Sequence, residues 1–161
     1  MKKIGRYMVL LLLFITLPLK AQNDKFFQDL SNIKGVTSVI ISETMLSLIG
    51  GNSDMIDIDN FDVKGILSKL KSIQILNSET AQSTKEMRQK IQTYLDKMNV
   101  MPIMSVKEDD EKTLIYFIEP KGKKDYAQLI LFVDETDEIS FISMSGTFKI
   151  EDLKGMMEQV K

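Results

Sequence analysis

The 161-residue sequence has no cysteine, no histidine and no tryptophan, and only three prolines. The lack of cysteine excludes disulfides and a thiol nucleophile, and the lack of both cysteine and histidine excludes the usual zinc clusters and a Ser-His triad. Apolar residues nevertheless make up 43% of the chain and charged residues 27%. This composition is typical of a globular protein rather than a disordered chain, and the length predicts one domain with its own core.

Residues 1–21 have the three parts of a secretory signal. A basic start that includes Arg6 precedes an apolar run over residues 8–19, and Ala21 ends a cleavage site. The run has 12 residues, so a helix would span roughly 18 Å, short of the ~30 Å hydrocarbon core of a bilayer. We therefore expect a cleavable signal and no stable transmembrane anchor. The lack of a cysteine after the run also excludes a lipid anchor made on such a residue.

Cleavage after Ala21 would leave residues 22–161 as a single domain. Four basic residues leave with the signal, so 17 basic residues remain against 23 acidic ones, a net charge of −6. An acidic chain with scattered lysines lacks the basic patch that nucleic-acid binding requires, which argues against a nucleic-acid partner. An exported domain without disulfides is ordinary in the bacterial periplasm. We therefore expect an exported bacterial protein, either periplasmic or secreted.

Helical and strand patterns alternate in the first half of the mature chain. The expected elements are, in order, a helix over residues 26–33, a buried strand over 36–41, a helix over 43–49, a helix over 62–70, a strand over 72–76 and a long helix from residue 83. The expected N-caps of these helices are Asn23 or Asp24, Ser42, Asp62, and Ser83 with Thr80 as an alternative. Met87, Ile91 and Leu95 form the apolar stripe of the long helix.

The second half changes to a period of two. It predicts four strands, over residues 103–107, 113–119, 126–133 and 139–145, joined by short turns. This spacing is typical of an antiparallel meander. A final amphipathic helix begins near Ile150. The whole pattern predicts an α+β domain, a mostly antiparallel sheet packed with amphipathic helices.

Two of the expected strands have no polar face. Every residue of 114–118 and 129–133 is apolar or aromatic, whereas a sheet with one wet face should alternate. Either the domain's own helices cover both faces, or one face meets a second copy, an apolar ligand or a partner.

The acidic residues invite metal and acid–base chemistry. The loop around Asp57 holds four aspartates, but an EF-hand counted from Asp57 fails at Phe61, Asp62 and Ser68. The acidic groups at 108–111 and 134–138 fall at expected hairpin tips, which offer no cleft to raise a carboxyl pKa. We therefore expect no metal site, no cofactor, no catalytic residue and no enzymatic activity.

Two further features have ordinary explanations. The basic residues among 121–124 read as a solvated hairpin turn, too few for a polyanion or anionic-lipid site. Most of the methionines follow apolar stripes and belong to the core, with Met101 and Met104 beside Pro102 less clearly so. Gly50 and Gly51 are not part of a phosphate-binding loop.

The chain resembles a known family of small exported bacterial proteins. The resemblance lies in the motifs Gly35-Val36-Thr37-Ser38-Val39 with Met45-Leu46, Ile73-Gln74-Ile75-Leu76, Ile139-Ser140-Phe141-Ile142 with Ser145-Gly146, and Ile150-Glu151-Asp152-Leu153. The family is domain of unknown function 4252, and the resemblance covers nearly all of the mature chain. It implies an envelope role and brings no functional residues with it. Many members carry a lipoprotein cysteine after the signal, and this chain lacks one.

Three hypotheses of function remain. The first is a non-enzymatic module that acts in the cell envelope by contact with an unknown protein partner or as a homodimer. The second is a periplasmic module that binds a lipid or small ligand in an apolar cavity. The third is a hydrolase that uses two carboxylates in a cleft.

Overall fold

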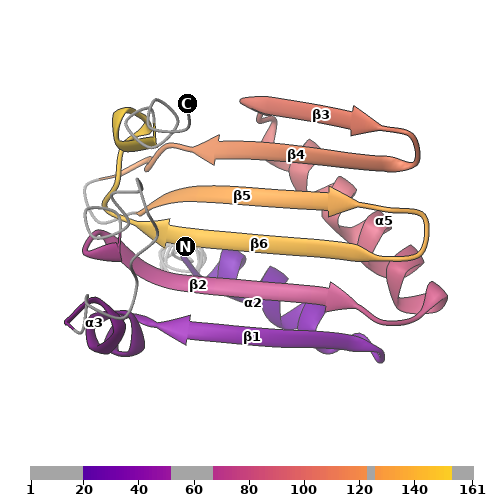
Figure 1. Ribbon diagram of the computed structural model, residues 1–161, viewed down its shortest axis with the longest axis horizontal. Helices are drawn as coiled ribbons and strands as arrows, with labels where there is room; N and C mark the ends of the chain where they lie inside the picture. Colours follow the sequence, from indigo (N-terminus) through magenta and orange to yellow (C-terminus); the bar gives the residue numbers. More distant parts are fainter. Residues whose placement is uncertain (1–19, 52–66, 123–125, 154–161) are drawn as a thin grey trace, which may run out of the picture.

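The computed structural model of the protein describes residues 20–51, 67–122 and 126–153 (Figure 1). Its elements are, in chain order, α2 (Lys20–Ser31), β1 (Val36–Ser42), α3 (Glu43–Gly51), β2 (Leu70–Ser78), α5 (Ala81–Met98), β3 (Met104–Glu108), β4 (Glu111–Ile118), β5 (Ala127–Asp134) and β6 (Ile139–Gly146). The fold is α+β and mostly sheet, as the sequence predicts.

The six strands form one sheet in the order β1-β2-β6-β5-β4-β3, and every neighbouring pair is antiparallel. The predicted four-strand meander is confirmed as β3 to β6. The first two strands extend it, because β2 pairs with β6 and β1 pairs with β2. The tip between β3 and β4 is a two-residue turn, in which Asp109 has a φ of 41°. Aspartate is among the residues that best tolerate this left-handed conformation.

Helices α2 and α5 lie against one face of the sheet (Figure 1). Because α5 connects β2 to β3, it must cross the three strands between them. Its buried stripe is Met87, Ile91 and Leu95, as predicted. These side chains pack on the inward residues of the strands and on Phe27 and Leu30 of α2. Phe141 of β6 lies at the centre of this core, 1% exposed.

A second apolar cluster lies at one end of the opposite face. Its buried members are Leu46 of α3, Leu70, Ala127 and Phe148. A bulge between Leu70 and Ser72 shifts the register of β2 against β6, which lets Leu70 join this cluster rather than the main core. Gly146 lies opposite Leu70, and a Cβ at Gly146 would lie 2.2 Å from the carbonyl oxygen of Lys69. Only glycine allows this approach of the two backbones.

Several boundaries differ from the sequence prediction. Asn23 and Asp24 lie inside α2 and are not its cap. The cap of α5 is Thr80, the alternative: the Ser83 N–H donates to Thr80 Oγ1 at 3.2 Å and the Thr80 N–H donates to Ser83 Oγ at 3.1 Å. Ser83, predicted as the cap, is therefore the third helical residue. Leu70 belongs to β2 rather than to a preceding helix.

The strand predicted over residues 36–41 exists as β1, but the prediction that it is buried is wrong. Four consecutive residues, from Thr37 to Ile40, are exposed. The physical reason is its place in the sheet, because β1 is an edge strand that pairs only with β2. The predicted cap Ser42 is confirmed, since the Met45 N–H donates to Ser42 Oγ at 3.4 Å.

Some predictions fall outside the described residues. These are residues 1–19 of the signal predicted over 1–21, most of the helix predicted at 62–70, and the end of the final helix, of which residues 150–153 are helical. The four aspartates at 54, 57, 59 and 62 and the lysines at 123 and 124 also lie outside.

Candidate functional site

The face of the sheet opposite α2 and α5 carries apolar rows that run across the strands. Residues paired in register lie side by side on the same face. One row crosses all six strands and is entirely apolar: Val39, Ile75, Ile142, Leu131, Ile115 and Met104. We call this face the open face.

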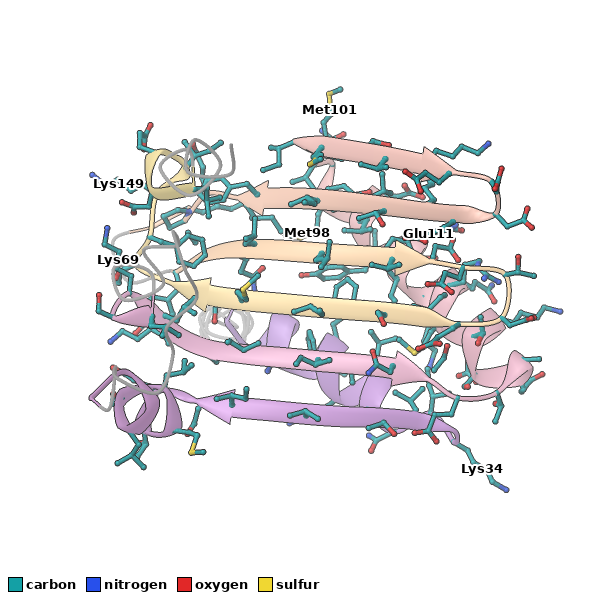
Figure 2. The ribbon with its side chains drawn as sticks, in the orientation of Figure 1. Lys34, Lys69, Met98, Met101, Glu111 and Lys149 are labelled. Atoms are coloured by element: carbon teal, nitrogen blue, oxygen red, sulfur yellow. The ribbon has the colours of Figure 1, made fainter. Side chains whose placement is uncertain are left out.

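A second row of the open face is mixed but uncharged. It consists of Thr37, Asn77, Ser140, Val133, Thr113 and Val106. No charged side chain stands in either row. The rows end at the two edge strands of the sheet. Figure 2 shows Lys34 just before the start of β1 at one edge and Met101 beyond β3 at the other.

The other end of the open face is covered. The row of Ile41, Ile73, Met144, Leu129 and Phe117 packs against the second cluster. The rings of Phe117 and Phe148 lie 6.1 Å apart. Among the described residues, cover on this face comes from α3, Leu67 and the segment after β6. The two rows of the open face therefore lie beyond this cover.

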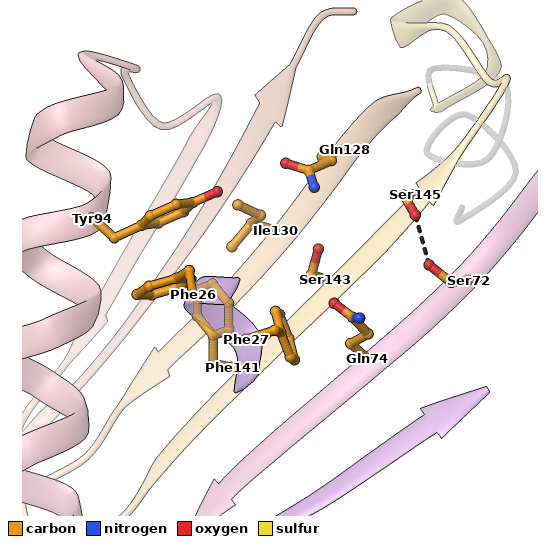
Figure 3. A pocket seen from close by; sticks show the side chains of 10 residues that line it. All are labelled: Phe26, Phe27, Ser72, Gln74, Tyr94, Gln128, Ile130, Phe141, Ser143 and Ser145. Carbon is orange, nitrogen blue, oxygen red and sulfur yellow. Dashed lines mark hydrogen bonds between the residues drawn. The ribbon is translucent and has the colours of Figure 1, made fainter. Parts of the chain in front are cut away.

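The helix-covered side contains a small polar pocket (Figure 3). Its floor consists of neutral polar side chains from three neighbouring strands: Ser72, Gln74, Gln128, Ser143 and Ser145. Its wall includes Phe26 of α2 and Tyr94 of α5, which stack with ring centroids 3.8 Å apart. The volume is about 50 Å³, room for a few water molecules. None of the described residues that line it is charged.

Two polar side chains of this pocket differ in how far they are buried, since Gln128 Oε1 is fully buried and Tyr94 is partly buried. Gln128 Oε1 is buried, and no group of the described part of the chain donates a hydrogen bond to it. Burial raises the pKa of Tyr94 to about 12, because a phenolate is less well solvated there than a phenol. The sequence did not point to this pocket, because serine and glutamine on strands are also typical of a solvated face.

The acids predicted at the hairpin tips lie at those tips. Glu108, Asp109, Asp110 and Glu111 are all exposed, and they form no cleft. The second group differs in one respect. Arg88 Nε of α5 donates to Asp134 Oδ1 at 2.7 Å, and Arg88 also donates to the carbonyl of Glu135 at 2.7 Å. Asp134 therefore fastens the tip to the long helix, a role that only the fold reveals.

Two further ion pairs flank the covered end of the open face. Lys69 Nζ lies 2.6 Å from Asp152 Oδ1, and this hydrogen bond, with that from the Lys149 backbone, lowers the pKa of the Asp152 carboxyl. Lys71 pairs with Glu43 of α3, and this bond raises the pKa of the Lys71 ammonium. Both pairs join elements distant in sequence.

The described ranges hold no group of three or more acidic side chains placed to bind a metal ion. In the same ranges, no helix is both long and apolar enough to cross a membrane. Lys121 is exposed at its turn, as predicted. Met87 is buried in the core, whereas Met101 and Met104 are exposed near the β3 edge.

Comparison with known proteins agrees with the resemblance seen in the sequence. Residues 27–156 match the model of the family described as Domain of unknown function (DUF4252). No curated protein matches the chain. No solved structure matches it either. The family match spans most of the described fold, from α2 to beyond β6, and the chain belongs to the DUF4252 family.

Proposed function

We propose that the protein is an exported bacterial cell-envelope module without enzymatic activity, and that it binds another polypeptide through the open face. The observation that carries the proposal is the apolar row that crosses all six strands. An apolar patch that spans a whole sheet is typical of an interaction surface. The export signal over residues 1–21 supports the location, and the lack of histidine and cysteine supports a role in binding.

The size of the uncovered strip favours a helix as the bound segment. Six strands about 4.8 Å apart make the strip about 24 Å long, and two rows about 7 Å apart set its width. An α-helix about 10 Å in diameter and about 16 residues long has these dimensions. The opposite face provides a precedent, since α5 crosses the strands of the same sheet (Figure 1).

The lack of charged side chains in the two rows indicates which kind of partner surface can bind there. Because neither row contains a charged side chain, a charged group buried against the strip would find no counter-ion there. We therefore propose an amphipathic helix with an uncharged apolar stripe. The threonine, asparagine and serine of the second row can satisfy polar side chains at the border of that stripe.

Site-specific photocrosslinking in envelope fractions tests this function. A photoreactive residue at Ile142 should crosslink to another protein, and the crosslinked segment should be an amphipathic helix. The same residue at Lys85, exposed on α5, is the matched control and should give no such product. Leu131→Asp should abolish the product, with the milder Leu131→Thr as a second variant. Crosslinks at Ile142 to lipid only, or to no molecule, would overturn the proposal.

The pocket favours a second candidate, a module that binds a small ligand. Its neutral polar floor and the unpaired acceptor at Gln128 Oε1 fit a neutral group with N–H or O–H donors, such as a primary amide. Acetamide is a suitable probe, and acetate is its charged control. Saturable NMR shifts of the backbone amide of Ser143, which also lines the pocket, would support this candidate if they are lost in Gln128→Leu and absent with acetate. Equal shifts with both probes would count against it.

A further inference from the structure

The two edges of the sheet differ in how they are protected from pairing. At the β3 edge, Pro102 precedes a strand of five residues that contains Lys107 and Glu108. Proline and charge are the usual devices that keep an edge strand from pairing with another chain. At the other edge, β1 has seven residues, none of them charged and none of them proline. Among the described strands only β2 pairs with β1, so the outer side of β1 can pair with another chain.

The backbone groups that β1 presents can be identified from its register. The Glu79 N–H donates to the Gly35 carbonyl at 2.8 Å, and Gly35 continues the register of Val36 with Ser78. Bonded pairs alternate along an antiparallel ladder, so the odd-numbered residues of β1 bond to β2. The even-numbered residues then point their N–H and C=O groups away from the sheet. Val36 fits this alternation, since its N–H donates to Ile33 instead.

Exposed apolar side chains accompany these free backbone groups. Val39 is 44% exposed on the open face, and Ile40 is 65% exposed on the opposite side of the strand. Met45 of α3, next to the end of β1, is half exposed. The edge therefore combines unpaired backbone with apolar surface, which is the combination that strand addition uses.

We propose that β1 pairs antiparallel with β1 of a second copy, with the two Val39 residues facing each other at a two-fold axis. This inference does not depend on the proposed function. In this register Ser38 faces Ile40 of the second copy, and both have their backbone groups pointing outward. About six hydrogen bonds can join the two strands. All seven residues of β1 are used.

Symmetry and charge both favour this register. Residues of equal parity face each other, so the open face of one copy continues into the open face of the other as a single surface. Lys34, exposed at one end of β1 (Figure 2), comes close to Glu43 at the far end of the second β1. The same attraction occurs twice because the contact is isologous, and such a contact closes at two copies.

Single-cysteine crosslinking tests the contact directly, because the chain has no cysteine of its own. The two residues at the axis form a non-hydrogen-bonded pair, with Cβ atoms about 5 Å apart. We expect Val39→Cys, expressed from the full coding sequence, to form a disulfide-linked dimer under mild oxidation. Val106→Cys at the β3 edge is the matched control and should stay monomeric in denaturing gels. The reverse result would overturn the proposal.

Charge reversal tests the register in solution. We expect light scattering to show a dimer for the unaltered protein. Val39→Lys and Val39→Glu should each weaken dimerisation about 100-fold, because like charges meet at the axis. An equal mixture of the two variants should restore the dimer, a result that loss of folding could not produce. Val106→Lys should leave the dimer intact.

Three results would overturn the proposal. The first is that the unaltered protein stays monomeric up to about 100 µM, where even a micromolar contact would be saturated. The second is a dimer that survives Val39→Lys. The third is growth into long oligomers. The last would indicate head-to-tail pairing of β1 with β3. None of these outcomes bears on crosslinking at Ile142, so the two proposals fail separately.

Discussion

Alternate residues of the same strands build two faces with different surroundings. Phe141 points into the core beneath α2 and α5 and is 1% exposed, whereas its neighbour Ile142 belongs to the open row and is only partly buried. Both are apolar, and both lie on the central strand β6. The difference teaches that an apolar residue on a strand indicates a face that avoids water, but does not identify what covers that face.

The largest expected effect comes from the centre of the covered face. Phe141 contacts Phe26, Phe27 and Phe132, so Phe141→Ala should leave a cavity. We expect a loss of about 3–5 kcal/mol in the free energy of unfolding, measured by urea denaturation. A loss below about 1 kcal/mol would mean that this face is not the core.

A buried polar cluster on the covered face gives the next effect. Ser78 Oγ accepts a hydrogen bond from the Ile139 N–H at 2.8 Å and lies 2.8 Å from Thr84 Oγ1. Ser78→Ala would leave that N–H buried without a partner. We expect a loss of about 1–3 kcal/mol in stability, measured by the same denaturation. Ser105→Ala, at an exposed position of β3, is the control and should change stability little.

A substitution on the open face should lower the free energy of unfolding much less. Ile142→Thr keeps a β-branched residue in a strand and removes little contact, because Ile142 is only partly buried and belongs to neither apolar cluster. We expect a loss of about 1 kcal/mol or less, together with weaker partner binding. A loss comparable to that of Phe141→Ala would show that the face is covered in the free protein and would remove the basis of the proposed function.

The sequence predicts where helices and strands lie along the chain better than it predicts which elements pack against one another. The stripe of α5 and the alternating strands of the meander follow from local periodicity, so their positions were correct to within a few residues. The prediction that β1 is buried is wrong, since a β-branched run indicates a strand but not its place in the sheet. The sequence favours Ser83 as the cap with Thr80 as the alternative, and it cannot separate them because both side chains can accept the same kind of hydrogen bond.

The candidate sites were predicted only in part. The strands without a polar face predict that both faces of the sheet carry apolar residues. The structure shows that α2 and α5 pack on one of these faces and that the other is the open face. The polar pocket depends on Gln128 and Ser143 of neighbouring strands lying beside Tyr94 of α5. A local sequence pattern does not predict such a tertiary contact. The bond from Arg88 to Asp134 depends on tertiary structure in the same way.

The smallest expected effect at neutral pH comes from Tyr94, which lies where the covered face borders the pocket. Tyr94 has its pKa raised by burial from 10.0 to about 12. In the unfolded chain the phenol loses its proton near pH 10, so this group leaves stability unchanged below that pH. Between about pH 10 and 12 the folded state keeps a proton that the unfolded state releases, and stability falls.

Ultraviolet titration of tyrosinate should therefore show one late transition that is missing in Tyr94→Phe. In the same variant, the part of the alkaline loss of stability that is due to Tyr94 should disappear. The pKa of Tyr116 is also raised by burial, and its share of the loss should remain. Because Tyr116 lies in the core beneath α5 and Tyr94 borders the pocket, opening of the pocket alone would lower the pKa of Tyr94 and leave that of Tyr116. Such a result would show that the stacked rings of Phe26 and Tyr94 form the border between the buried core and the pocket.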